Sequence, residues 1–188
     1  MSEIYTGVKF RIKKLGNLEY SKDLEIQSRI VSEGLASLQK DWSTSSSGNV
    51  SIRTKKGFLI SSTGTELYNL SYPNDFCEVV SSSQEKRIRF YGNRIPSSET
   101  RMHLLALENN TNENYCLHVH LSNIEKLQIL DRFPVTSKFL SYGTIDLARE
   151  ASNLLKSSDI VILRDHGIIT MGNDFIVIID EIKRISRL

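Results

Sequence analysis

The sequence predicts one α/β domain in which helices pack on a mixed, mostly antiparallel sheet. The chain has 188 residues, an ordinary length for one domain with its own core. Segments near both ends repeat their apolar residues at the period of an amphipathic helix. Between them lie short runs rich in β-branched and aromatic residues, separated by Gly, Ser, Asn and Pro, which is typical of an antiparallel meander.

The expected elements follow one another along the chain. Residues 22–42 have apolar side chains close to every 3.6 positions, which predicts a first helix. Residues 96–99 have the composition of a helix start and lead into a helix over 101–108. Further helices are expected over 144–156 and, although β-branched residues oppose it, over 174–188. The expected strands are 50–53, 57–62, 76–81, 88–91, 115–121 and 159–164.

Composition argues against several classes of protein. No apolar run approaches the roughly 18 residues of a membrane-spanning helix, and the N-terminus lacks the apolar stretch of a secretory signal, so a cytoplasmic protein is expected. Twenty-four Lys plus Arg against 22 Asp plus Glu leave no basic field for nucleic acid. The two cysteines, Cys77 and Cys116, are too few for a disulfide framework and are expected to be structural thiols.

Three of the four histidines are spaced as ligands of one metal ion would be. His118 and His120 lie two residues apart in an expected strand, so their imidazoles project from the same face, with Cα atoms about 7 Å apart. His166 lies in a turn at the end of another expected strand. Three imidazoles with a carboxylate or water describe a catalytic zinc site. The alternative is a pair of hydrogen-bonded histidines on a half-exposed strand; His103 is expected to have a structural or surface role.

Polar loops that contain glycine lie at the ends of the expected strands. A small residue there lets backbone N–H groups approach an anion closely, and hydroxyls at a helix N-terminus can add to such a site. Together these loops predict a phosphate cradle that needs no lysine, and ordinary turn chemistry is the alternative. The candidate residues are Gly48, Asn49, Thr63, Gly64, Ser97 and Ser98.

Glu99 follows the two serines directly. It would therefore lie beside a bound phosphate and, if its helix points toward the histidines, beside the metal. A carboxylate in that place could move protons to and from carbon or hydroxyl groups. The alternative is an acid that only stabilises the first turn of its helix, by at most about 1 kcal/mol.

The order of these pieces resembles one family. The chain contains, in sequence, SSGNVSIR, LISSTGTEL, IPSSETRMH, CLHVHLSN and ILRDHGIITMG. This set resembles the class II aldolase and adducin head family from about residue 24 to the end. The resemblance implies a three-layer α/β/α domain over residues 1–188, with 1–20 as an N-terminal extension, and a homotetramer with active sites at subunit boundaries. It also implies one zinc ion on His118, His120 and His166, Glu99 as proton carrier, and the six loop residues as phosphate ligands.

The resemblance implies a reaction class as well. Ser-Ser-Glu before the helix is similar to the fuculose-phosphate aldolases, which suggests a lyase for a small phosphorylated sugar. Such a lyase cleaves a ketose 1-phosphate to dihydroxyacetone phosphate and an aldehyde, through an enediolate that the metal stabilises. The stretch from His120 to Tyr142 is shorter than in those aldolases, which leaves methylthioribulose-1-phosphate dehydratase and pentulose-5-phosphate 4-epimerase as alternatives. An alternative of another class is a non-catalytic, adducin-like assembly module.

Overall fold

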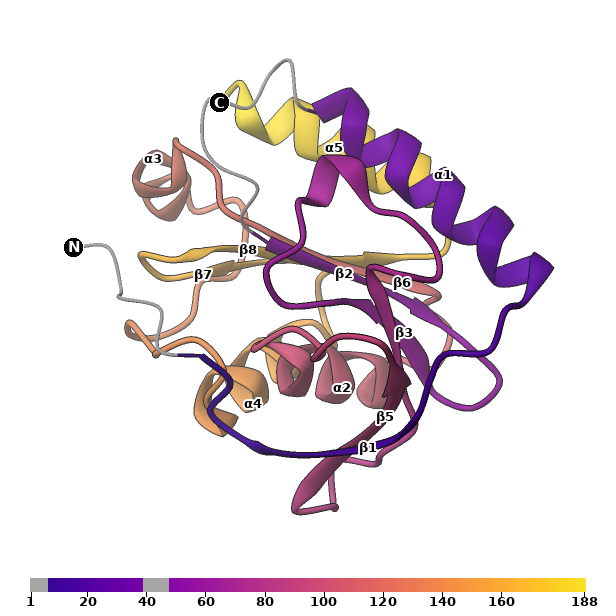
Figure 1. Cartoon of the computed structure of the whole chain (residues 1–188). Coiled ribbons are helices and arrows are strands. Elements are labelled where there is room, and N and C mark those ends of the chain that lie inside the picture. The colour runs from indigo at the N-terminus through magenta and orange to yellow at the C-terminus, as the bar shows by residue number, and fades with distance from the viewer. Residues whose placement is uncertain (1–6, 39–47) are drawn as a thin grey trace.

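An eight-stranded sheet lies between two layers of helices in the computed structural model, which describes residues 7–38 and 48–188 (Figure 1). The strand order is β1-β5-β4-β3-β2-β6-β8-β7. Among these described strands six neighbouring pairs are antiparallel, and β1 with β5 is the single parallel pair. The predicted three-layer α/β/α fold with a mostly antiparallel sheet is confirmed.

The bounds of the elements differ from the predicted ones mainly by one to three residues at their ends. The strands are β1 Arg11–Gly16, β2 Gly48–Arg53, β3 Phe58–Ser61, β4 Phe76–Val79, β5 Arg87–Gly92, β6 Tyr115–Val119, β7 Ile160–Leu163 and β8 Gly167–Gly172. The helices are α1 Lys22–Leu38, the short 3-10 helix η1 Leu67–Asn69, α2 Thr100–Asn109, α3 Ile124–Ile129, α4 Ile145–Leu154 and α5 Phe175–Ser186. The predicted end of the first helix, residues 39–42, lies outside the described residues.

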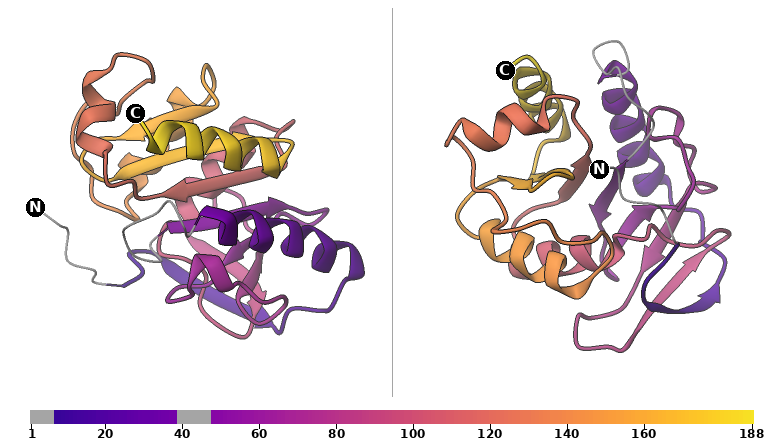
Figure 2. Two further views of the ribbon diagram at one scale, coloured as in Figure 1. Left: turned by 90° about the horizontal axis from the view of Figure 1, so that it is seen from above. Right: turned by 90° about the vertical axis from the view of Figure 1, so that its left-hand side faces the viewer.

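Each face of the sheet has its own hydrophobic core (Figures 1 and 2). Helices α1 and α5 cover one face, where Leu117 and Val119 of β6 join their core. Helices α2 and α4 cover the other face, where Cys116 of the same strand packs. Because side chains alternate along a strand, His118 and His120 belong with Cys116 on the α2 face.

The C-terminal helix α5 confirms a prediction that its β-branched residues opposed. The side chain of Asp174 accepts hydrogen bonds from the backbone N–H groups of Ile176 and Val177, which caps the first turn. Four isoleucines at helical spacing are buried against the sheet and α1. Burial of that apolar stripe outweighs the weak helix propensity of isoleucine. The four are Ile178, Ile179, Ile182 and Ile185.

Besides the short η1, three elements were not predicted from the sequence. Strand β1, within the expected N-terminal extension, pairs with β5 at the sheet edge and exposes charged residues there. Strand β8 is buried on both faces over most of its length, so it lacks the alternation that marks a half-buried strand. Helix α3 has only six residues, too few for a clear helical period.

Two expectations from composition can be compared with the structure. Cys77 and Cys116 are buried free thiols, as expected of structural cysteines, and burial raises the pKa of each. Within residues 7–38 and 48–188, every helix is too short or too polar to span a bilayer.

The tight turn between β7 and β8 brings distant parts of the chain together. Asp165 adopts a φ of 57° in this turn, and Gly167 begins β8. A β carbon on Gly167 would lie 2.5 Å from the carbonyl oxygen of Val119, and within 3.0 and 3.1 Å of the His118 and His120 rings. Only glycine therefore lets this turn pack directly against the end of β6.

We expect Gly167→Ala to lower the free energy of unfolding by about 1–3 kcal/mol, because the added methyl group meets backbone that cannot move aside. Gly172→Ala, at the other end of β8, is the matched control, since its methyl group would meet only the flexible side chain of Ile178, at 3.3 Å. Urea unfolding of both variants measures the difference. Equal losses in the two variants would contradict the close approach at Gly167.

Candidate metal centre

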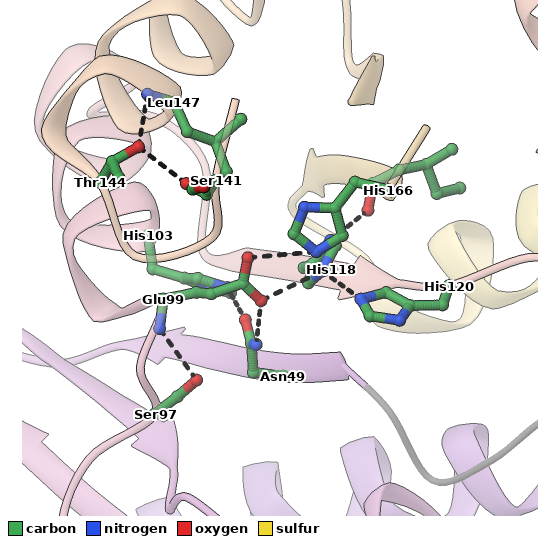
Figure 3. A network of polar contacts seen from close by, with 11 residues as sticks. Asn49, Ser97, Glu99, His103, His118, His120, Ser141, Thr144, Leu147 and His166 are labelled. Carbon is green, nitrogen blue, oxygen red and sulfur yellow. Dashed lines mark hydrogen bonds and ion pairs between the residues drawn. The ribbon is translucent and has the colours of Figure 1, made fainter. Parts of the chain in front are cut away.

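Three imidazoles meet at one end of the sheet on the α2 face (Figure 3). His118 and His120 come from the end of β6, and His166 comes from the turn between β7 and β8. Their ring centroids are 4.8–4.9 Å apart in all three pairs. The Nε2 atoms of His118 and His120 are separated by 3.0 Å. The structure therefore brings together the three histidines that the sequence singled out.

Glu99 completes this cluster with a carboxylate. It is the N-cap residue of α2, but its side chain makes no capping hydrogen bond and turns toward the histidines instead. Its Oε2 lies 3.1 Å from Nε2 of His118, and its Oε1 lies 3.6 Å from Nε2 of His166. Ligand atoms of the four side chains all lie within 4.8 Å of one another. Glu99 is therefore not an acid that only stabilises the first turn of its helix, because its carboxylate contacts the histidines instead.

Burial and neighbouring charges set the protonation of the cluster. Burial alone would raise the pKa of Glu99, but His118, His166 and the hydrogen bond from Asn49 hold that pKa well below its usual range, so Glu99 is ionised. Burial, with His118 and His166 nearby, lowers the pKa of His120 to about 3, so its imidazole is neutral. Burial opposes the charged form of His118 too, but Glu99 outweighs it and raises the His118 pKa.

The residues of the cluster fit a divalent transition metal. Nδ1 of His118 donates to the carbonyl oxygen of Ile168 at 2.8 Å, which leaves Nε2 to face the other ligands. Glu99 Oε1 is buried and accepts no hydrogen bond from the described residues, so it has a lone pair to offer. Imidazole nitrogens with one carboxylate oxygen are the donor set of zinc and related ions, and a cation would take the place of a proton on His118.

Two of the predicted phosphate loops lie side by side next to this cluster. The N–H of Thr63 donates to the carbonyl of Ile95 at 2.9 Å, and the N–H of Ser97 donates to the carbonyl of Ser61 at 3.2 Å. Ser97 and Ser98 are buried directly before Glu99. A β carbon on Gly64 would lie 4.0 Å from a guanidinium nitrogen of Arg94. Arg94, which pairs with Asp75 at 3.0 Å, thus lies beside the loops, and the sequence analysis did not anticipate it.

The other predicted phosphate residues, Gly48 and Asn49, serve the pairing of β2 with β6. Gly48 has a φ of 145°, and a β carbon there would lie 2.4 Å from the carbonyl oxygen of His118. The side-chain amide of Asn49 donates to Glu99 Oε2 at 2.8 Å, and its carbonyl oxygen contacts His103. The Asn49 side chain is therefore engaged by Glu99 and His103.

His103 and Ser51 belong to the surroundings of the site, although the sequence analysis did not single out Ser51. His103 is fully buried, which excludes the surface role considered for it and agrees with the structural one. Its Nδ1 lies 2.7 Å from the hydroxyl of Ser51. One signal could have indicated this contact, because the polar residues Asn49 and Ser51 alternate with the apolar Val50 and Ile52 along the strand.

One protein family matches most of the chain. The family described as "Class II Aldolase and Adducin N-terminal domain" matches residues 28–183. An L-fuculose phosphate aldolase from Haemophilus influenzae is 25% identical over 166 residues, which cover 80% of this chain and 74% of that protein. An L-fuculose phosphate aldolase from Methanococcus maripaludis is 31% identical over 146 residues, covering 69% of this chain and 74% of that protein.

A solved structure shows the same fold. An L-fuculose 1-phosphate aldolase superposes with a TM-score of 0.70 at 22% identity, and the match covers 89% of this chain and 85% of that one. The family match spans most of the chain, and the cluster of three histidines and Glu99 lies within the matched residues. The chain therefore belongs to the class II aldolase and adducin N-terminal domain family.

Proposed function

We propose that this chain is a metal-dependent lyase that cleaves a ketose 1-phosphate into dihydroxyacetone phosphate and an aldehyde. One observation carries the proposal: a buried, ionised carboxylate lies against three imidazoles that converge on one point. The relatives named L-fuculose phosphate aldolases support the same reaction class. Zinc, one ion per subunit, is the metal we propose.

The chain's own residues have distinct tasks in such a reaction. His118, His120 and His166 would hold the metal as neutral imidazoles. The bound metal would supply Lewis-acid polarisation of the substrate carbonyl. In the cleavage, the hydroxyl on C4 loses its proton, the C3–C4 bond breaks, and its electron pair remains on C3. The proton released from the C4 hydroxyl balances the one that C3 gains. Glu99, which is ionised at rest, takes up a proton and delivers it to C3, and this is the transfer we assign to it.

We further propose that the substrate phosphate binds the adjacent loops. The support is that Thr63 and Gly64 lie beside Ser97 and Ser98, with Arg94 close to Gly64. Hydroxyl groups and a nearby guanidinium are suited to a phosphate, whereas the N–H groups of Thr63 and Ser97 are already used within the loops. As the family resemblance implies, the subunits would form a homotetramer. A molar mass of one chain, measured by light scattering, would contradict that assembly.

Metal content tests the ligand set. Protein purified without chelator is expected to contain close to one zinc ion per chain by elemental analysis. His118→Ala and His120→Ala should each lose most of it, because an open ligand position weakens the site. An exposed-residue variant, Gln84→Ala in the loop between β4 and β5, is the control and should retain the metal. A wild-type chain without bound metal would favour the non-catalytic assembly module.

Glu99→Gln separates proton transfer from metal binding. The amide keeps the size of the side chain but cannot accept the proton, so turnover should fall by about 10²–10⁴-fold while bound metal stays close to wild type. Steady-state kinetics and elemental analysis of the same samples measure the two effects. Glu125→Gln, an exposed carboxylate on α3, is the control. Activity that survives Glu99→Gln would remove Glu99 from the mechanism.

A panel of three phosphorylated sugars tests the reaction class. We expect fuculose 1-phosphate to be cleaved with release of dihydroxyacetone phosphate, which a coupled reductase assay detects. Ribulose 5-phosphate tests epimerisation and methylthioribulose 1-phosphate tests loss of water, both followed by NMR of the products. Turnover of one of these two without any cleavage of the first sugar would replace the aldolase by that alternative.

A further inference from the structure

A series of hydrogen bonds through four buried side chains leads from the interior of the domain to the candidate metal centre. Ser51 contacts Nδ1 of His103, Nε2 of His103 contacts the carbonyl oxygen of Asn49, and the amide of Asn49 contacts Glu99 Oε2. All four side chains are at most 5% exposed, so water has little access to these contacts. Figure 3 shows Asn49, His103 and Glu99 turned toward one another.

The spacing of these residues explains why they meet. Asn49 and Ser51 are two apart on β2, so both side chains point to the α2 face of the sheet. Glu99 and His103 are four apart, at the start of α2 and one turn into it, so both lie on the same side of that helix. The two pairs therefore face each other across the space between sheet and helix.

The chemistry of the four side chains determines which atom donates in each of these hydrogen bonds. An ionised carboxylate only accepts, so Asn49 must present its NH₂ group to Glu99 and its carbonyl oxygen to His103. His103 must then donate from Nε2, and a neutral ring leaves Nδ1 to accept from the hydroxyl of Ser51. Burial, with His118 nearby, lowers the pKa of His103 to about 3, which keeps the ring neutral.

We propose that His103 is a positioning residue that acts on Glu99 through the amide of Asn49. The donor at Nε2 selects the amide orientation in which NH₂ faces Glu99, and that hydrogen bond aims the carboxylate at His118 and His166. Without this donor the amide can rotate and present its oxygen to the carboxylate, which is repulsive in a buried site. This role rests on the proposed function of Glu99 as proton carrier.

Two amide variants separate the two ring nitrogens of His103. The nitrogen of Gln can take the place of Nε2 and still reach Asn49, whereas the shorter Asn reaches only as far as Nδ1. We expect His103→Gln to retain most of kcat and His103→Asn to lose about 10–100-fold, with KM and bound metal near wild type in both. Equal kcat values for the two variants, or a loss confined to KM, would overturn the proposal.

A conservative core change on the same helix controls for general destabilisation. Leu107→Val removes one buried methylene from α2, away from the chain of hydrogen bonds, and should lower thermal stability while kcat stays near wild type. If Leu107→Val loses as much kcat as His103→Asn, then the effect of His103 is only structural.

The tautomer of His103 provides a test that needs no activity. Long-range ¹H–¹⁵N spectra of histidine-labelled wild-type protein should show a neutral His103 ring protonated at Nε2 and not at Nδ1. Protonation at Nδ1, or a charged ring at neutral pH, would overturn the proposal. A wild-type chain that turns over none of the three sugars would instead contradict the proposed function, while the tautomer would still decide whether the hydrogen-bond chain exists.

Discussion

The register of β6 between its two neighbours is the constraint on which the rest of the site depends. His118 pairs with Asn49 of β2 on one side and with Ile169 of β8 on the other. This pairing places the Asn49 side chain next to the helix that carries Glu99, and it places the turn with His166 beside the end of β6. A slip of one residue would turn His118 and His120 into the α1 and α5 core. Gly48 and Gly167 permit this register because neither position has room for a β carbon.

The cluster of Glu99 with the three histidines places charged groups in the buried part of the domain. An isolated buried carboxylate is costly, and here His118, His166 and the Asn49 amide offset that cost for Glu99. The surroundings on both sides are closely packed apolar cores, which limit how far these side chains can move. Packing of this kind favours a preorganised site, and preorganisation favours metal binding and proton transfer.

Membership of the family establishes the fold but not the reaction, since one fold can carry different functions. The arrangement of particular side chains therefore has to carry the functional argument. In this chain three imidazoles and a carboxylate that could hold a metal ion lie together, and the serine pair before Glu99 lies beside the Thr63 loop. The segment between β6 and α4 has little regular structure. It consists of the short helix α3 and an extended stretch that lies beside β7.

The sequence by itself determined the features that follow from local periodicity. Alternation along a strand placed His118 and His120 on one face, and the apolar stripes identified α1, α4 and α5. Only the tertiary structure decided that His166 approaches them, that the Asn49 side chain serves Glu99, and that His103 stands behind it. The physical reason is that side-chain direction depends on neighbouring residues in the chain, whereas strand register and close approach depend on packing between segments distant in sequence. Strands β1 and β8 were not predicted for the same reason. Strand β1 is a charged strand at the sheet edge, and β8 is buried by partners that the sequence does not identify.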